Sequence, residues 1–434
     1  MQYQPDTIFS DESLWQSWLD VEAALARVQA KIGLIPVWAG NRISKAAKLE
    51  KIGKDTLKKD IKRTLAPILS LTRLLADAAG DAGDYVHWGA TTQNVMQTGR
   101  IILIRHANKE IRTSLAAAAT HLGKLASEEA QTIMVGRTNR QYALPITFGF
   151  KVAGWIAEFE RAVLRLSGAA ERLFVLPFGG AIGAMHAFGD RGRLLNQKLA
   201  QELKLAEMLV PSRTMNDVFV EYLLQLSLLA MFVERVMIEA YTLMGGDFGE
   251  LSENLGEDAV GSSTMPQKVN PKYVIPVAAQ AGQLKSYATT ALESGRASHE
   301  GDPLANQILS SVINNAVPLA WTMANDFSSA LTRLVVQREV MKKNLMSVGA
   351  SVTTEKLMMN LAPLVGRGKA HDIVHHALET GGPSALKKDP NILKHFSVKE
   401  IEETLDPTNY LGDSVEIAIK AGNRARALAK KLMD

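Results

Sequence analysis

The chain has 434 residues, of which 47% are hydrophobic, 6% are aromatic and none is cysteine. The lack of cysteine excludes disulfides, thiolate metal sites and cysteine nucleophiles, and the net charge of +4, without a basic tail, argues against a nucleic-acid binder. No apolar stretch reaches the ~20 residues of a bilayer crossing and the N-terminus lacks a secretory pattern, so we expect a cytoplasmic protein with no nucleic-acid or membrane partner.

The first predicted helix covers residues 11–32. Its apolar residues recur at a spacing of three to four, Ser10 precedes it as an N-cap, and Gly33 stops it. Residues 40–75 are predicted to form shorter helices. Four glycines then punctuate a predicted loop region over residues 80–99.

Four long helical segments follow, over residues 98–131, 147–176, 217–244 and 277–292. Segment 217–244 is apolar almost all round, which indicates burial on every side. Leu, Ala, Ile, Val and Met must fill the core, and that mixture suits helix packing. No pattern of alternating strands appears. The predicted fold is all-α, with a central bundle of long helices shared between subunits.

Residues 245–271 interrupt the helical rhythm with a segment too long and too glycine-rich for an ordinary connector, which is typical of a functional loop. From about Ser351 the pattern is one of shorter helices. We therefore predict three helical domains, over residues 1–97, 98–350 (with the signature loop at 256–272) and 351–434.

The sequence GSSTMPQKVNP at residues 261–271 carries the strongest chemical signal. A glycine that permits an unusual backbone turn precedes Ser262 and Ser263, and Lys268 and Asn270 follow. An enzyme that removes a proton next to a carboxylate must stabilise a dianionic intermediate, so it needs a base at the carbon and donors around the oxygens. A flexible polar loop explains any short piece of this stretch, whereas the whole stretch indicates a catalytic loop.

This stretch resembles the signature loop of the fumarase/aspartase superfamily, which includes argininosuccinate lyase, adenylosuccinate lyase and 3-carboxy-cis,cis-muconate cycloisomerase. The resemblance implies a homotetramer whose active sites are built from three subunits. It implies that a serine of the loop is the general base, here Ser262 or Ser263, with a slight preference for Ser263. It further implies a catalytic role for Lys268, and contacts of Met265 and Asn270 with the substrate.

Two other stretches resemble superfamily regions. The first is HWGATTQN, in which the resemblance implies that Thr91 and Thr92 bind a carboxylate and that His87 lines the pocket; a helix-initiating turn is the structural alternative. The second is GRTNRQYALP, in which it places a further group of residues near the substrate; a loop with solvated arginines is the alternative. The residues of this second group are Arg137, Thr138 and Gln141.

The combination of YVHWGATTQ and QYALPITFG most resembles 3-carboxy-cis,cis-muconate cycloisomerase, and adenylosuccinate lyase next. Asn139 stands where the nucleotide branch carries a histidine acting as general acid, and an amide cannot take that role. Asn94 and Gln97 replace two aspartates, and Asn216 falls where an arginine is usual. These changes remove charges from the expected pocket.

The resulting hypothesis is a cofactor-free, metal-free homotetramer that catalyses cycloisomerisation or β-elimination on a small di- or tricarboxylate. One alternative is a fumarate-forming lyase of the adenylosuccinate or argininosuccinate type. Another is a catalytically silent structural paralogue. The histidines His371, His375 and His376 lack a third-ligand pattern, so we interpret them as surface or packing residues rather than a zinc site.

Overall fold

The computed structural model describes residues 3–257, 261–265 and 267–433. Pro266 of the signature motif and residues 258–260 of the signature loop lie outside the described residues, as do the outermost residues of the terminal domains, 1–2 and 434. The chain is 72% helical and 5% strand, which confirms the all-α class.

The chain divides into two compact units, each assembled from separate stretches of sequence. The first unit comprises Met1–Thr113, Ala162–Met231 and Ala279–Asn325; the second comprises Ser114–Arg161, Phe232–Ala278 and Asp326–Asp434. These two discontinuous units do not correspond to consecutive segments of the chain, so they do not test the predicted division into three consecutive domains. That division stays a prediction.

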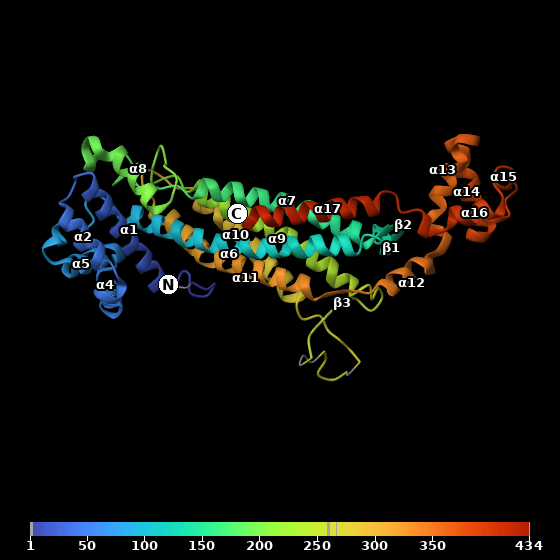
Figure 1. Ribbon diagram of the computed structural model, residues 1–434, viewed down its shortest axis with the longest axis horizontal. Coiled ribbons are helices and arrows are strands. Elements are labelled where there is room, and N and C mark those ends of the chain that lie inside the picture. Colours follow the sequence, from blue (N-terminus) through green and yellow to red (C-terminus); the bar gives the residue numbers. More distant parts are fainter. Residues whose placement is uncertain (1–2, 258–260, 266, 434) are drawn as a thin grey trace. The chain divides into compact units, whose positions relative to one another are not determined.

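Short helices make up much of the first unit (Figure 1). The helix α1 begins at Asp11, where the Ser10 hydroxyl oxygen accepts the Ser13 amide at 3.3 Å, and it ends at Lys31, before Gly33 takes a φ of 72°. The predicted cap and stop are therefore confirmed. The other short helices of this unit are α2 (Val37–Ala46), α3 (Leu49–Ile52), α4 (Lys54–Thr64), α5 (Pro67–Ala79), η1 (Gly80–Tyr85), η2 (His186–Arg191) and α8 (Gly192–Leu203).

Five long helices each contribute residues to both units: α6 (Thr92–Glu128), α7 (Phe148–Leu173), α9 (Asp217–Leu243), α10 (Val274–Ser294) and α11 (Pro303–Arg333). The four predicted long helices are confirmed as α6, α7, α9 and α10. Helix α6 begins at Thr92, earlier than predicted, and continues through Gly99. A Cβ at position 99 would lie less than 3 Å from Ser17 and from Trp18 of α1, so the close approach of the two helices requires glycine there. Glycine at that position serves helix packing rather than a turn.

Helix α9 was predicted to be buried on every side, and within one chain that expectation is wrong. Met231 is 44% exposed, and Ile238 and Tyr241 are about half exposed. A second chain packed on this face would cover these apolar side chains, so the shared bundle stays a prediction.

The sequence pattern indicated no strands, and that expectation is wrong at residues 133–147, where the structure has a β-hairpin. Strand β1 (Ile133–Thr138) pairs antiparallel with β2 (Gln141–Thr147), and the turn residues Asn139 and Arg140 both have positive φ, 49° and 64°. Such a turn matches the twist of a two-residue hairpin and favours asparagine. Gly136 and Pro145 disfavour interior strands, but a two-stranded ribbon tolerates both because each strand is an edge.

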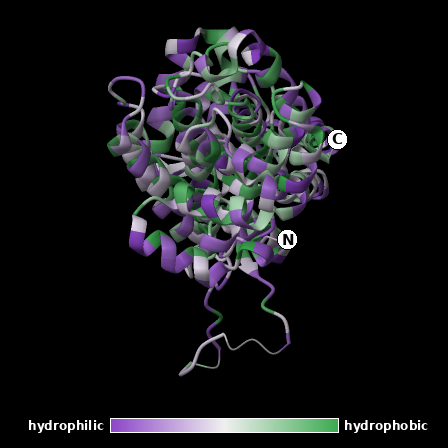
Figure 2. Cartoon of the chain, turned by 90° about the vertical axis from the view of Figure 1, so that its left-hand side faces the viewer, coloured by the Kyte–Doolittle hydropathy of each residue, from purple (hydrophilic) through white to green (hydrophobic). Residues whose placement is uncertain are grey.

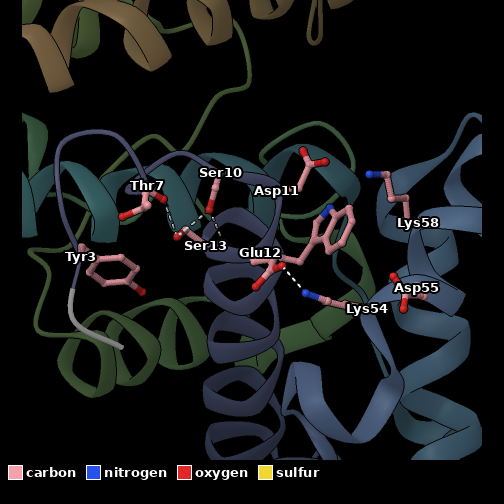
Figure 3. A pocket seen from close by; sticks show the side chains of 10 residues that line it. Tyr3, Thr7, Ser10, Asp11, Glu12, Ser13, Lys54, Asp55 and Lys58 are labelled. Carbon is pink, nitrogen blue, oxygen red and sulfur yellow. Dashed lines mark hydrogen bonds and ion pairs between the residues drawn. The ribbon is translucent and has the colours of Figure 1, made fainter.

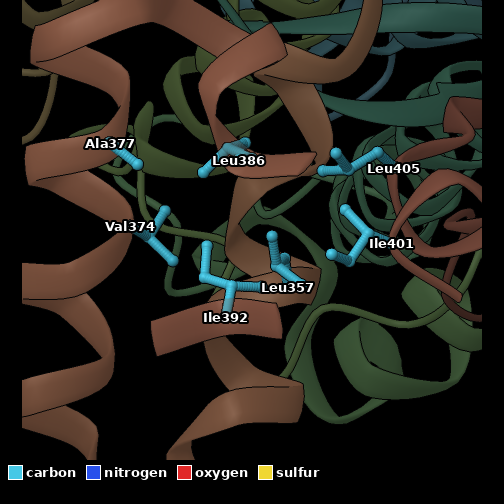
Figure 4. Close-up of a cluster of buried hydrophobic side chains, with 7 residues drawn as sticks. All are labelled: Leu357, Val374, Ala377, Leu386, Ile392, Ile401 and Leu405. Atoms are coloured by element: carbon cyan, nitrogen blue, oxygen red, sulfur yellow. The ribbon is translucent and has the colours of Figure 1, made fainter. Parts of the chain in front are cut away.

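The remaining elements belong to the second unit: β3 (Leu251–Glu253), β4 (Leu334–Val336), α12 (Arg338–Val348), η3 (Gly349–Thr353), α13 (Thr354–Val365), α14 (Arg367–Gly381), η4 (Gly382–Lys387), α15 (Pro390–Leu393), α16 (Val398–Leu405), η5 (Pro407–Asn409) and α17 (Ser414–Met433). The predicted series of short helices after Ser351 is confirmed. They enclose a buried apolar cluster (Figure 4) formed by Leu357, Val374, Ala377, Leu386, Ile392, Ile401 and Leu405.

Candidate functional site

The signature motif lies in the loop between β3 and α10, which projects from the second unit (Figures 1 and 2). The loop closes on itself: the Asn270 amide donates to the Gly261 carbonyl at 3.2 Å, and the Lys268 amide donates to the Met265 carbonyl at 3.0 Å. A Cβ at position 261 would lie 2.8 Å from the Lys268 carbonyl oxygen. The glycine therefore permits close approach of two backbone segments, and its part in an unusual backbone turn stays a prediction.

The two serines of the motif have different surroundings. The Ser262 hydroxyl oxygen accepts the Met265 amide at 3.1 Å and the Thr264 amide at 3.4 Å, so it stabilises the local turn. The Ser263 side chain is exposed and forms no hydrogen bond with any described residue. Of the two, Ser263 is therefore the hydroxyl available to a ligand.

The other predicted groups of the loop also face outward. Lys268 is exposed and has no ion-pair partner in the described part of the chain, and Met265 is 43% exposed. Asn270 is half-buried near the closed end of the loop. The motif thus presents a hydroxyl, a cation and an amide, and no carboxylate among the described residues pairs with the cation.

A buried carboxylate anchors both ends of this loop. Glu253, at the end of β3, accepts the amides of Lys272, Tyr273 and Val274, the last at 2.8 Å, where α10 begins. An acid that receives the free amides at a helix N-terminus also complements the helix dipole. The start of the loop is held by the pairing of β3 with β4, and its end is held by the bonds from the first amides of α10 to Glu253.

The hairpin groups lie in the same unit, and one of them is engaged within the fold. Arg137 forms a two-pronged ion pair with Glu250, at 2.7 and 3.0 Å, and packs 4.8 Å from the centre of the Phe248 ring. Glu250 is fully buried. Thr138 and Gln141 face each other at the exposed end of the hairpin. Their contact with substrate, and that of Arg137, stays a prediction.

The predicted carboxylate-binding stretch lies in the first unit. His87, with a φ of 58°, bonds through Nδ1 to the buried Glu22 at 2.6 Å. Burial alone would lower the pKa of His87, but the hydrogen bond and the negative charge of Glu22 outweigh burial and raise it. Thr91 precedes α6 and Thr92 opens it, with the Val95 amide reaching the Thr91 carbonyl at 3.4 Å. Both threonines therefore lie at a helix N-terminus, where anions are favoured.

Three of the residues that replace expected charges, Asn94, Gln97 and Asn216, are buried in this unit and engaged in hydrogen bonds. Asn94 donates to the Pro177 carbonyl and accepts the Gly180 amide at 3.0 Å. Gln97 donates to Asn216 at 3.0 Å, and Asn216 donates in turn to the Ser294 carbonyl at 3.1 Å. These amides do structural work that the sequence did not reveal, because their partners are distant in the chain.

Next to Thr92 lies a cavity of about 550 Å³ within the first unit. It is lined by one face of α6, by the start of α11, and by Arg213. Arg100 of α6 also lines it, and the sequence pattern did not single this residue out. Arg100 follows Met96 by four residues and Thr92 by eight, and residues at this spacing share a helix face. That spacing could have identified Arg100 as a neighbour of Thr92.

A second hollow of the first unit, about 600 Å³, lies over the start of α1 (Figure 3). It is lined by charges of both signs, and its Glu12 and Lys54 pair at 2.8 Å. Because charges of both signs line this hollow and two of them pair with each other, it lacks the uncompensated charge that would attract a charged ligand.

In the described part of the chain, no group of three or more His, Cys, Asp or Glu is placed to hold a metal ion. Among those same residues, no helix has the length and apolarity of a membrane span.

Comparison with known proteins agrees with the resemblance. A family profile described as a lyase matches residues 3–284. An adenylosuccinate lyase of Methanothermobacter thermautotrophicus is 31% identical, over 94% of this chain and 93% of that protein, and trans-aconitate decarboxylase 1 of Mycosarcoma maydis is 31% identical, over 93% and 84%.

Among solved structures, a 3-carboxy-cis,cis-muconate lactonizing enzyme from Pseudomonas putida superposes with a TM-score of 0.87 at 28% identity, covering 98% of this chain and 97% of that one. The shared fold, the family profile and the relatives together confirm the resemblance drawn from the signature motif. The chain belongs to the fumarase/aspartase superfamily and is an enzyme of that superfamily.

Proposed function

We propose that this enzyme transfers a proton at the carbon next to a carboxylate of a small di- or tricarboxylate, in the manner of 3-carboxy-cis,cis-muconate cycloisomerase. The observation that carries the proposal is the closed signature loop, in which Ser263 is unengaged while Ser262 holds the turn. A serine alkoxide is scarcely populated in water, so in this proposal the loop folds over the substrate and excludes water.

In this proposal each loop group has one task. In the lactone-opening direction the Ser263 alkoxide takes the proton from the carbon next to the carboxylate and becomes a hydroxyl. The electron pair forms a carbon–carbon double bond, and the ring C–O bond breaks to release a carboxylate. In the lactone-forming direction the serine returns the proton to that carbon. Lys268 and Asn270 hold the developing negative oxygens, while Thr91, Thr92 and Gln141 hold a carboxylate.

We infer that the working form is a homotetramer. The apolar side chains exposed on α9, among them Ile238 and Tyr241, are covered in this proposal by other copies of the chain. The resemblance implies that such an assembly brings residues of three subunits into one site. Size measurement of the purified protein tests this directly.

The reaction is tested by the ultraviolet absorbance of 3-carboxy-cis,cis-muconate incubated with the wild type and with the Ser262→Ala/Ser263→Ala variant. We expect the diene absorbance to fall with the wild type only. An unchanged absorbance with the wild type would remove the cycloisomerase assignment.

Two further reactions belong in the same experiment. Release of fumarate from adenylosuccinate or argininosuccinate would identify the eliminating alternative. Release of carbon dioxide from trans-aconitate is also included, because the decarboxylase of Mycosarcoma maydis is among the similar proteins. A silent paralogue would turn over none of these compounds, and no polycarboxylate would raise its melting temperature.

A further inference from the structure

The cavity beside Thr92 contains an arginine that the fold does not use. Arg100 is 7% exposed, and its guanidinium forms no hydrogen bond or ion pair with any described residue. Its Nε in particular is buried without a partner. Burial lowers the pKa of this guanidinium to about 10, so it stays charged at neutral pH. A buried, unpaired charge is costly and therefore indicates a missing partner.

A second arginine of the cavity is held only by neutral groups. The Arg213 Nε donates to the Gln93 side chain at 3.0 Å, and an Nη donates to the Ala181 carbonyl. Gln93 donates back to the Arg213 carbonyl at 2.9 Å, which fixes the pair. A Cβ on Gly301 would lie 2.8 Å from the guanidinium, so this glycine leaves room for the arginine.

Among the described residues that line the cavity, no acidic side chain balances these two cations. Apart from the arginines, the described residues of the cavity lining are apolar, hydroxyl-bearing or amide-bearing. Asp302 lies next to the lining residue Gly301 in sequence, but its carboxylate accepts the Ser298 and Leu304 amides and caps α11. The described lining is therefore positively charged as well as polar.

The amides and hydroxyls of the cavity add neutral polar groups on α11. Asn306, Gln307 and Ser310 lie on the helix face that lines the cavity, and Asn314 follows one turn later with a buried side-chain oxygen that has no partner. A volume of about 550 Å³ is ample for a small polycarboxylate. Planar guanidinium groups bind carboxylate and phosphate oxygens through paired hydrogen bonds.

We propose that Arg100 and Arg213 form an oxyanion subsite that binds a second anionic group of the substrate, beyond the carboxylate held by Thr91 and Thr92. This proposal rests on the proposed function for the identity of the ligand, and it makes Arg100 a specificity-determining residue. It favours a substrate with at least two separated carboxylates. A phosphate group has the same chemistry and is distinguished by the test.

The test is calorimetric titration of the purified full-length protein with tricarballylate, and separately with inorganic phosphate, at fixed ionic strength. The variants are Arg100→Leu, Arg100→Lys and, as a matched control, Arg165→Leu, which removes an equal charge from an exposed position of α7. We expect tricarballylate to bind the wild type and the control equally. We expect about 10- to 100-fold weaker binding to Arg100→Leu, with Arg100→Lys between them.

Asn314→Asp keeps the proposal testable should Arg100→Leu fail to fold. It adds a carboxylate to the lining without removing an arginine, and we expect it to weaken tricarballylate binding by a similar factor. Arg100-dependent binding of phosphate alone would support the oxyanion subsite and assign it to a phosphate ester.

Three results would overturn the proposal: no saturable binding of either anion to the wild type, equal binding by wild type and Arg100→Leu, or dissociation of the oligomer in Arg100→Leu without any change in anion affinity. The last would mean that Arg100 pairs with another copy of the chain. Calorimetric binding needs no turnover, so the titration reports on the subsite whether or not the serine reaction occurs. Failure of the serine mechanism is thereby separated from failure of this subsite.

Discussion

The signature loop and the cavity beside α6 are built in opposite ways. The loop is exposed and closed mainly by its own backbone, with Glu253 holding its ends. The cavity lies among helices, and its rim is fixed by buried amides such as Gln97 and Asn216, which bond to each other. In the proposed function the loop supplies the reactive groups, and in the proposed subsite the cavity supplies a fixed shape and charge.

The largest expected effect comes from removing the proposed base of the signature loop. Replacing Ser263 by alanine removes the proposed base and should lower kcat by about 10²- to 10⁴-fold. Ser262→Ala should cost less, since that oxygen serves the local turn. Rates of both variants on the compound turned over by the wild type provide the measurement, and a larger loss in Ser262→Ala would exchange the two roles.

The next effect concerns the rigidity of the cavity rim. Asn216→Ala leaves Gln97 and the Ser294 carbonyl without their bonds in a buried place, so we expect about 1–3 kcal/mol lower free energy of unfolding. Urea denaturation measures it. A control at the exposed Arg165, replaced by alanine, should change stability by less than about 0.5 kcal/mol.

Removing the carboxylate that anchors the signature loop should loosen the loop more than the rest of the protein. Glu253→Ala removes the acceptor for the first amides of α10, so we expect about 1–2 kcal/mol of lost stability. The more sensitive reading is limited proteolysis, in which cleavage between β3 and α10 should become faster than in Asn216→Ala. Equal cleavage in the two variants would show that the loop and the rim are not independent.

The smallest effect is the pH dependence of the pair formed by His87 and Glu22. Because the folded-state pKa of His87 is raised, its stabilising contribution is fully present below the unfolded pKa of ~6.5 and is lost as pH rises through the folded value. Denaturation of the wild type across this range, beside Glu22→Gln, measures the contribution. The variant should lose that part of the pH dependence; an identical slope in both would contradict the assignment.

Much of the fold was predictable because long amphipathic helices and their caps are local features. The cap at Ser10 and the extents of α7 and α9 follow directly from spacing and breakers. The hairpin at Asn139 was missed because a short ribbon accepts glycine and proline where longer sheets do not. The exposed side of α9 was missed because composition cannot tell burial within one chain from burial between chains.

The candidate site was less accessible to sequence reasoning. The motif residues are contiguous, so roles for Ser263 and Lys268 could be proposed from their order together with the family resemblance. The engagement of Arg137 by Glu250 and the isolation of Arg100 depend on contacts across long sequence separations. An unpaired buried charge is a property of three-dimensional packing, and no spacing rule reveals it.

Proton transfer at a carbon next to a carboxylate is tested most directly by nuclear magnetic resonance in D₂O, with the same set of polycarboxylates incubated with the wild type and with Ser263→Ala. The mechanism predicts that the wild type incorporates solvent deuterium at that carbon in at least one compound, and that Ser263→Ala does so about 10²-fold or more slowly. Equal incorporation by both proteins, or none by the wild type with any compound, would contradict it.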